Sequence, residues 1–366
     1  MKIALLGAGH IGQTIARLLI DSGDYSVTVI DQSANALAKL SSLGAKTLTI
    51  DSADAHLLEA ALDGHDAVIN ALPYHLAVRV ATAAKAAHCH YFDLTEDVAA
   101  TKAIMALAEG AQTAFMPQCG LAPGFIGIAA HHLAQGFDSL DEIKMRVGAL
   151  PVFPTNALKY NLTWSVDGLI NEYCHPCEAI HEGALTARLP LEGLEHFSLD
   201  GVEYEAFNTS GGLGTLCETL AGRVRSLDYK SVRYPGHRAL MQFLLTELRL
   251  SDDTETLKRM LRKSVPSTMQ DVVLIFVTVS GMRHGTYVQE VFARKIFAER
   301  GEGTHEGVSA IQITTAGGIC AVLDLFRAGK LPRSGFIRQE QVALPDFLAN
   351  RFGSAYDSSR RIESIS

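Results

Sequence analysis

The chain opens with a glycine pattern that restricts the fold of everything around it. The stretch "KIALLGAGHIGQTIARLLIDSGDYSVTVIDQS", residues 2–33, places Gly7, Gly9 and Gly12 between an apolar run and a run with helical spacing. In a strand–turn–helix unit, the first glycine permits the tight turn. The second lets the backbone approach a pyrophosphate, and the third lets helix and strand pack closely. The helix start, with His10 and Ile11, then presents N–H groups to phosphate. The pattern predicts a dinucleotide-binding βαβ unit.

The end of the second expected strand indicates which dinucleotide is bound. Asp31 closes that strand, and its carboxylate is expected to accept a hydrogen bond from a ribose 2′-hydroxyl and to repel a 2′-phosphate. Gln32 and Ser33 follow, so no arginine stands there to bind a 2′-phosphate. The sequence therefore favours NAD over NADP. A capping role for Asp31 at the next helix is the alternative interpretation.

The first third of the chain alternates strand-like and helix-like segments. This rhythm is typical of parallel strands joined by right-handed helical crossovers, and it predicts a Rossmann-type, doubly wound α/β sheet. The expected strands are 2–8, 25–31, 45–51, 65–73, 90–95 and 114–120, and the expected helices are 11–23, 33–44, 53–64 and 75–88.

The rhythm changes after about residue 123. The remaining segments read mostly as strands and turns, with a helix over 121–137 and another over 309–329 that returns to the first domain. The expected strands are 142–150, 160–166, 176–183, 185–191 and a hairpin over 271–297, with Gly281 and Gly285 near its turn. We therefore predict a Rossmann domain over 1–124, a second α+β substrate and dimerisation domain over 125–305, and C-terminal helices over 306–352. The polar tail beyond 352 is expected to be loosely ordered.

Composition excludes several classes of partner. With a formal net charge of −8, the chain has no general electrostatic reason to bind nucleic acid or an anionic membrane. Its apolar runs, such as 271–281, have strand length, so no membrane span is expected. Six cysteines in 366 residues are too few for a disulfide scaffold, which favours a reducing, cytoplasmic setting. His131 and His132 lack a partner set of ligands, so no metal site is predicted.

Several longer motifs resemble one enzyme family over nearly the whole chain. The stretches "NALPYHLAVRVATAAKAAHCHYFDLTED" and "CGLAPGF" are similar to the saccharopine dehydrogenase family. Within it, "LKYNLTWSVDGLINEY" and "RYPGH" resemble lysine 6-dehydrogenase and its close relatives. The resemblance implies a Rossmann domain joined to a substrate and dimerisation domain. It also implies oxidation of an amino-acid C–N bond with NAD(P), or reduction of the corresponding imine. It argues for a nicotinamide cofactor over FAD, which a glycine turn would also fit.

Carried onto this chain, the resemblance places cofactor contacts at the carboxyl ends of the strands, where ligands of α/β sheets bind. Leu94 and Thr95 would lie near the nicotinamide ribose, and Cys119 would lie where the chain crosses between domains. The remaining implied contacts are Asn70, Ala71, Leu72 and Pro73 along the cofactor, and Asp51 and Ser52 beside the adenine.

The chemistry requires a group that takes a proton from the substrate amine before hydride leaves. Candidates are Lys159, His237, Asp93 and Glu96, with Cys119 a weaker one. Alternatively, Lys159 is a solvated loop lysine and His237 only caps a turn.

An amino-acid substrate also needs donors for its carboxylate, and a guanidinium suits this role. Arg233 and Arg223 are the candidates, although Arg233 also reads as a surface arginine. Trp164 is either a substrate wall or packing, and the glycine-rich stretch from Thr209 offers further N–H groups to a carboxylate.

Together these observations predict an NAD-dependent dehydrogenase for a lysine-derived amino acid. The alternatives are a non-catalytic NAD-binding protein of the same fold and an NADP-dependent opine-type reductase. The segment "VVLIFVTVS" of the expected hairpin is apolar on both faces, and a strand of this kind must be covered on both sides. A second copy of the chain is the simplest cover, which predicts a homodimer through the second domain. Helices from 210–265 of the same chain are the alternative cover.

Overall fold

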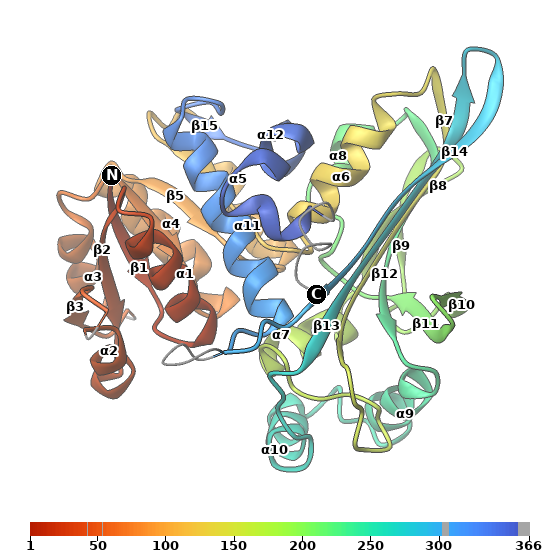
Figure 1. Ribbon diagram of the computed structural model, residues 1–366, viewed down its shortest axis with the longest axis horizontal. Coiled ribbons are helices and arrows are strands. Elements are labelled where there is room, and N and C mark those ends of the chain that lie inside the picture. The colour runs from red at the N-terminus through yellow and green to blue at the C-terminus, as the bar shows by residue number, and fades with distance from the viewer. Residues whose placement is uncertain (42, 53, 302–306, 358–366) are drawn as a thin grey trace. The chain divides into compact units, whose positions relative to one another are not determined.

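The computed structural model describes residues 1–41, 43–52, 54–301 and 307–357. It contains two compact units (Figure 1): Met1–Phe125 together with Gln312–Ser366, and Ile126–Ile311. The sequence placed the first boundary between 124 and 125 and the second between 305 and 306. Residue 306 lies outside the described residues, and the two units divide at 311 and 312.

The first unit is built on a seven-stranded sheet in the order β15-β6-β5-β4-β1-β2-β3. Every strand pair in it is parallel, which confirms the doubly wound Rossmann-type fold. The strands are β1 (Lys2–Leu6), β2 (Ser26–Asp31), β3 (Lys46–Thr49), β4 (Ala67–Asn70), β5 (His90–Asp93), β6 (Ala114–Met116) and β15 (Gly335–Phe336).

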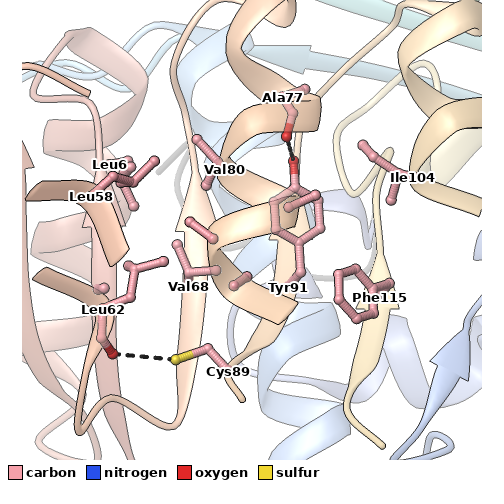
Figure 2. Close-up of a cluster of buried hydrophobic side chains, with 14 of the residues drawn as sticks. Leu6, Leu58, Leu62, Val68, Ala77, Val80, Cys89, Tyr91, Ile104 and Phe115 are labelled. Atoms are coloured by element: carbon pink, nitrogen blue, oxygen red, sulfur yellow. Dashed lines mark hydrogen bonds between the residues drawn. The ribbon is translucent and has the colours of Figure 1, made fainter. Parts of the chain in front are cut away.

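Helices cover this sheet because each crossover carries an apolar stripe. One part of the core joins strands β4, β5 and β6 to their neighbouring helices (Figure 2), where Val68, Tyr91 and Phe115 pack beside Val80 and Ile104. The helices are α1 (His10–Asp21), α2 (Ala34–Ser41), α3 (Ala55–Leu62), α4 (Ala77–Ala86), α5 (Val98–Ala108), α11 (Ala310–Arg327) and α12 (Leu344–Ala349). Short 3-10 turns lie at Tyr74–Leu76, Gln339–Gln341 and Gly353–Tyr356. Neither α5 nor α12 was predicted from the sequence.

Helix α11 is the one described helix that is long and apolar enough to cross a membrane, with a mean hydropathy of 1.2 over 18 residues. A helix was expected over 309–329, and α11 confirms it. This stretch is 72% buried inside the protein, as the core helix of a folded domain is. Polar contacts also tie its carboxyl end to the first unit. The Asp324 carboxylate accepts hydrogen bonds from the Tyr25 hydroxyl at 2.6 Å and from Arg351 at 3.0 Å.

The second unit contains a mixed sheet in the order β10-β11-β12-β7-β13-β14, and β8 pairs with both β12 and β9. In Figure 1, the long strands β7, β13 and β14 run side by side. The strands are β7 (Ser139–Pro151), β8 (Cys177–His181), β9 (Ala184–Arg188), β10 (Glu195–Leu199), β11 (Val202–Asn208), β12 (Val224–Arg233), β13 (Asp271–Arg283) and β14 (Thr286–Phe297). The helices are α6 (Phe125–Ala134), α7 (Val166–Cys174), α8 (Leu216–Leu220), α9 (His237–Gln242) and α10 (Thr254–Ser264), and a π-helical turn spans Phe243–Glu247.

Two details of the second unit differ from the sequence-based expectations. The strand expected over 160–166 is wrong, because the chain there forms no strand and α7 begins at Val166. Ser165 sets that start, since its hydroxyl accepts a hydrogen bond from Gly168 N–H at 3.2 Å. The 271–297 hairpin is confirmed, but Gly281 lies inside β13 rather than at the turn. A Cβ there would stand 2.1 Å from the Ser139 carbonyl oxygen, so close strand packing explains this glycine.

The start of the C-terminal tail is ordered, contrary to expectation. Tyr356 is fully buried, stacks on Phe125 at 3.9 Å between ring centroids, and donates a hydrogen bond to the Thr314 carbonyl at 2.7 Å. These contacts hold Gly353–Tyr356 in a 3-10 turn within the first unit. The rest of the tail, 358–366, lies outside the described residues.

Candidate functional site

In the first unit, the glycine loop has the geometry that a bound pyrophosphate requires. Gly7 has φ +103°, and a Cβ at Gly12 would stand 1.9 Å from the Gly7 carbonyl oxygen. Only glycine therefore fits at these two positions. At Gly9 a Cβ would meet nothing within 4 Å, and no side chain caps the amino end of α1 there. The loop thus leaves open space beside uncapped N–H groups, where phosphate oxygens can bind.

Asp31 lies beside this loop and helps to hold it. Its carboxylate accepts hydrogen bonds from Ala8 N–H at 2.7 Å and from Ser33 N–H at 2.8 Å. The hydrogen bond from Ser33 is local, as the capping interpretation expects. The hydrogen bond from Ala8 instead fixes the glycine turn. Each carboxylate oxygen can accept more than one hydrogen bond, so a ribose hydroxyl remains a compatible partner.

The ends of the neighbouring strands place the other expected cofactor contacts. Asn70, at the end of β4, is buried and accepts a hydrogen bond from Leu72 N–H at 3.1 Å, which shapes the turn that continues to Pro73. Ser52 and Thr95 are buried, whereas Asp51 is exposed. These residues follow β3, β4 and β5, so the first unit gathers them at the carboxyl edge of its sheet.

Asp93, a candidate proton acceptor, is enclosed in a hydrogen-bond network at the end of β5. The residue is 1% exposed. One carboxylate oxygen accepts from Tyr91 OH at 2.6 Å, and the other accepts from the N–H groups of Thr95 at 3.0 Å and Gln118 at 2.9 Å. Burial raises the pKa of Asp93 from 3.8 to about 6, although these hydrogen bonds oppose the rise. The geometry assigns Asp93 to fixing the loops after β5 and β6.

This network yields a prediction for Asp93→Asn. The amide oxygen can accept from both N–H groups, and the amide nitrogen can donate to Tyr91, whose hydroxyl can donate to the Ala77 carbonyl at 3.2 Å. A folded-state pKa raised to about 6 costs stability at neutral pH. The cost is about 3 kcal/mol at ~1.36 kcal/mol per unit of pKa, and it disappears as pH falls through about 6 towards 4. We therefore expect the variant to be at least as stable as wild type at pH 7.5 and to lose about half of this advantage at pH 5.

Chemical unfolding at both pH values measures that difference. Turnover by Asp93→Asn separates the two roles of the carboxylate, because a residue that fixes loops tolerates an isosteric amide. A hundredfold loss of kcat with normal stability would show that Asp93 is the proton acceptor.

Cys119 is not suited to accept a proton. The residue is 1% exposed, and its thiol donates to the Met116 carbonyl at 3.1 Å and lies 3.3 Å from the Gln339 amide nitrogen. Burial raises the pKa of this thiol, so it stays protonated at neutral pH. Its position after β6 leaves it a packing role in the first unit.

In the second unit, a buried cluster forms around Arg233, the last residue of β12. Arg233 is 3% exposed, and its guanidinium lies 5.1 Å from the ring centroid of Tyr160 and 5.8 Å from that of Tyr173. Its Nε donates to Tyr173 OH at 2.9 Å, and its Nη1 donates to the Val232 carbonyl at 2.8 Å. Over the described residues, no carboxylate forms a salt bridge with Arg233, although Glu172 lies near enough to attract it.

The same cluster contains His237, the first residue of α9. Its Nε2 lies 3.1 Å from Tyr173 OH and its Nδ1 2.9 Å from the Leu158 carbonyl. Burial, with a smaller effect from Arg233, lowers the pKa of His237 to about 3. Because both ring nitrogens are engaged and the ring is neutral, the structure does not support His237 as a general base near neutral pH.

The remaining candidates have distinct surroundings. Lys159 is exposed, has φ +49°, and donates from Nζ to the Pro235 carbonyl at 3.0 Å, so it lies beside the turn that carries His237. Thr209 is buried, and its hydroxyl lies 2.8 Å from that of Ser231. Trp164 donates to Tyr160 OH at 3.0 Å and packs beside the core, as its packing interpretation expects.

Arg223 does not share the site of Arg233. It is exposed and precedes β12, whereas Arg233 ends that strand. At ~3.3 Å per residue, the two Cα atoms lie about 33 Å apart, so one carboxylate cannot contact both.

Four residues that surround or adjoin Arg233 were not predicted from the sequence: Tyr160, Tyr173, Tyr229 and Ser231. Tyr173 was not identified because a strand was wrongly predicted over 160–166, so the start of α7 was not recognised. Tyr229, Ser231 and Arg233 stand at alternate positions of β12 and therefore point to one face of the sheet. That alternation, in "DYKSVRYPGH", is the sequence signal from which Tyr229 and Ser231 could have been predicted as neighbours of Arg233.

Comparison with known proteins matches each part of the chain to a domain of one enzyme family. Residues 3–116 match the model of the saccharopine dehydrogenase NADP-binding domain, and residues 120–352 match that of the saccharopine dehydrogenase C-terminal domain. The chain belongs to the saccharopine dehydrogenase family. This membership confirms the resemblance found in the sequence and supports an oxidoreductase with a nicotinamide cofactor. The first matching model is named for NADP binding, whereas the expectation from Asp31 in the sequence was NAD.

Solved structures agree with this family fold. Apo saccharopine dehydrogenase (L-Glu forming) from Saccharomyces cerevisiae is similar with a TM-score of 0.73 and 16% identity, over 97% of this chain and 96% of that chain. A probable dehydrogenase from Thermotoga maritima is similar with a TM-score of 0.47 and 10% identity, over 97% and 93% of the two chains. The likeness to the yeast enzyme concerns the fold alone, and the second TM-score is too low to support any conclusion.

Proposed function

We propose that the protein is an NAD-dependent dehydrogenase that acts on the C–N bond of a lysine-derived amino acid. The observation that carries this proposal is the buried guanidinium of Arg233, which lacks a salt-bridge partner over the described residues. A buried charge is costly unless it is paired, and a substrate carboxylate would pair it. The resemblance of "LKYNLTWSVDGLINEY" and "RYPGH" to lysine 6-dehydrogenase supports the choice of substrate.

The first unit fits a nicotinamide dinucleotide, since open space at Gly9 adjoins the uncapped start of α1. When bound, a nicotinamide would supply a hydride acceptor for the substrate carbon. The chain itself would hold the phosphates at α1 and the substrate carboxylate at Arg233. Lys159 remains our candidate for accepting the proton from the amine.

Initial rates of NADH formation test the proposal with L-lysine, saccharopine and other diamines and opines as substrates. We expect turnover with one lysine-derived compound. No turnover with any of them would contradict the proposal. If NAD bound while no amino acid changed the fluorescence of bound nicotinamide, the non-catalytic alternative would be supported.

Our preference for NAD gives a prediction for Asp31. Replacing Asp31 by Arg removes the acceptor for the 2′-hydroxyl and the repulsion of a 2′-phosphate. It also removes the bond to Ala8 N–H, so NAD binding should weaken more than NADP binding improves. We expect the ratio of kcat/KM for NAD to that for NADP to fall at least tenfold. Asp31→Asn, which keeps an acceptor for Ala8, is the control, and an unchanged ratio in Asp31→Arg would refute the assignment.

We also propose that the protein is a homodimer, with contacts through the second unit. Strand β13 is largely buried within a single chain, so its apolar faces do not need a second copy as cover. The support now comes from β14, the edge strand, where the exposed side chains of Tyr287, Val291 and Phe297 stand at odd positions and share one face.

Light scattering at micromolar concentration tests this assembly, and we expect twice the chain mass of 39.4 kDa. Val291→Lys places a charge in the proposed contact and should yield monomers. A wild-type mass near that of a single chain would rule the dimer out.

The six cysteines are all free, which supports our placing the protein in a reducing, cytoplasmic compartment.

A further inference from the structure

A chain of hydrogen bonds connects Arg233 to a rigid part of the second unit. Arg233 Nε donates to Tyr173 OH at 2.9 Å, and that hydroxyl lies 3.1 Å from His237 Nε2. His237 Nδ1 in turn lies 2.9 Å from the Leu158 carbonyl. All three side chains are buried, so water does not replace these bonds.

Chemistry fixes the direction of every bond in this chain. A carbonyl oxygen only accepts, so His237 Nδ1 carries the proton and donates to Leu158. His237 Nε2 is then an acceptor, and Tyr173 OH must donate to it. The same hydroxyl accepts from Arg233, whose guanidinium only donates. The neutral ring of His237 therefore orients the Tyr173 hydroxyl with its lone pairs towards Arg233.

The fold holds both ends of the chain. Gly236, with φ +101°, turns the backbone from β12 into α9, so that His237 follows Arg233 closely. The buried Glu205 carboxylate fixes this turn by accepting hydrogen bonds from Gly236 N–H at 2.9 Å and Arg238 N–H at 2.6 Å. Phe207 stacks on the His237 ring at 6.3 Å between centroids. The imidazole therefore has little freedom to rotate.

The arrangement leaves part of the guanidinium for a ligand. Arginine has five N–H donors. One on Nε binds Tyr173 and one on Nη1 binds Val232, so three remain, on Nη1 and Nη2. Two adjacent donors of this kind match the two oxygens of a carboxylate.

We propose that Tyr173 and His237 are positioning residues, which hold the Arg233 guanidinium so that its Nη donors face the substrate carboxylate. This inference rests on the proposed function, because it requires a carboxylate substrate. It replaces the expectation that His237 is the proton acceptor. The ring acts through Tyr173 and Arg233 and does not touch the reacting atoms.

The first test is Tyr173→Phe, which keeps the ring and removes the hydroxyl. Arg233 then loses the acceptor at Nε, and its remaining donors lose their fixed orientation. A hydrogen bond to a charged group is worth enough to change binding about tenfold or more. We expect KM for the amino acid to rise about tenfold, kcat to stay within threefold, and the Kd for NAD to stay unchanged.

The matched control is Tyr234→Phe, one residue beyond Arg233 in the chain. Its hydroxyl donates to the Pro151 carbonyl at 2.9 Å, and its ring packs with Val232 on the other side of the strand. This variant loses a comparable hydrogen bond without touching Arg233, so its KM should stay within twofold of wild type. If Tyr173→Phe raises KM no more than Tyr234→Phe does, the proposal is overturned.

Variants of His237 separate positioning from proton transfer. His237→Gln keeps an acceptor for Tyr173 OH and is expected to retain kcat and most of the substrate affinity. His237→Leu removes that acceptor and is expected to raise KM as Tyr173→Phe does. A general base would show the opposite pattern, in which both variants lose kcat at least a hundredfold and the acidic limb of the pH profile disappears. That pattern would overturn the proposal.

A direct spectroscopic measurement covers the case in which a variant fails to fold. In wild-type protein labelled with ¹⁵N-histidine, His237 is expected to show the neutral Nδ1–H tautomer at every pH from 5 to 9. Titration within that range would overturn the proposal.

Failure of the proposed function has a different signature. The wild type could turn over no amino acid and still bind L-lysine in the presence of NAD. In that case the Kd for L-lysine is measured in place of KM, and Tyr173→Phe is again compared with Tyr234→Phe. If it neither turns over nor binds any amino acid, the proposed function and this inference fail together. An active wild type with an unaffected Tyr173→Phe variant would overturn the inference alone.

Discussion

Gly12→Ala is expected to destabilise the first unit severely and to abolish NAD binding. A Cβ at this position would stand 1.9 Å from the Gly7 carbonyl oxygen and 2.9 Å from the Gly7 carbonyl carbon, and both atoms belong to the backbone. Relief requires α1 to move away from the glycine turn, which breaks the packing of Ile15 and Leu19 beneath it. We expect a loss of about 3 kcal/mol, at the upper end of overpacking effects. Calorimetry with and without NAD measures both consequences.

Gly9→Ala is the matched control for that experiment. Gly9 has φ −71°, which alanine adopts without strain, and its Cβ would meet nothing within 4 Å. The variant should therefore be as stable as wild type, or more stable by about 0.5 kcal/mol because its unfolded chain is less flexible. The methyl group would nevertheless occupy the space proposed for the pyrophosphate, so the Kd for NAD should rise at least tenfold. An unchanged Kd would show that the phosphates bind elsewhere.

The fold of the first unit could be predicted because its constraints are local. The glycines, the β-branched runs and the alternating helix pattern each fix a short segment, and parallel crossovers leave few ways to join them. The observed sheet contains each of the six strands predicted for this unit in shortened form, and it adds β15 from near the C-terminus. That two-residue strand was not predictable, because Gly335 and Phe336 carry no periodicity of their own.

The second unit was harder because tertiary contacts override its local patterns. The stretch "YNLTWSV" has strand-like composition, yet the chain there packs Tyr160 and Trp164 against the helices of a buried cluster. Ser165 marks the start of α7, but the β-branched Val166 that follows it favours a strand, so the helix start was not predicted. Strand β12 is stabilised by β7, a partner far along the chain, and a single sequence does not show such pairing.

The site shows the same division. Residue type alone selected Arg233 and His237, because guanidinium and imidazole groups serve recognition and proton transfer. The role of each depends on neighbours that come from α7, β11 and the loop after β7. Tyr173, which joins the two, carries no sequence signal of that function. The sequence therefore identified members of the cluster, and the structure was needed to show that His237 is neutral and fully engaged.

The largest kinetic effect is expected from Arg233→Met. Methionine has a similar length and no charge, so it fills the space between Tyr160 and Tyr173 but offers no donor to a carboxylate. Truncating one partner of a buried charge pair typically costs about 2–5 kcal/mol. We therefore expect KM for the amino acid to rise at least thirtyfold, whereas the Kd for NAD, for which we propose a site in the first unit, should not change.

Two comparisons identify the cause of that effect. 1,5-Diaminopentane, which is lysine without its carboxylate, should be turned over equally poorly by wild type and variant, so the preference for the amino acid should collapse. Arg225→Met, on the same strand, removes an exposed arginine that pairs with Asp141 and Glu182, and it should leave KM unchanged.

Thermal unfolding shows whether Arg233 serves binding or stability. The variant loses a desolvated charge that no salt bridge offsets over the described residues. It also loses the attraction between that charge and Glu172 and the hydrogen bonds to Tyr173 OH and the Val232 carbonyl. Because the relief from desolvation opposes these losses, we expect Tm to stay within about 3 °C of wild type. A structural arginine would instead lower Tm steeply and impair both substrates alike. A fall in Tm of about 10 °C, with equal losses for lysine and 1,5-diaminopentane, would therefore remove Arg233 from the substrate site.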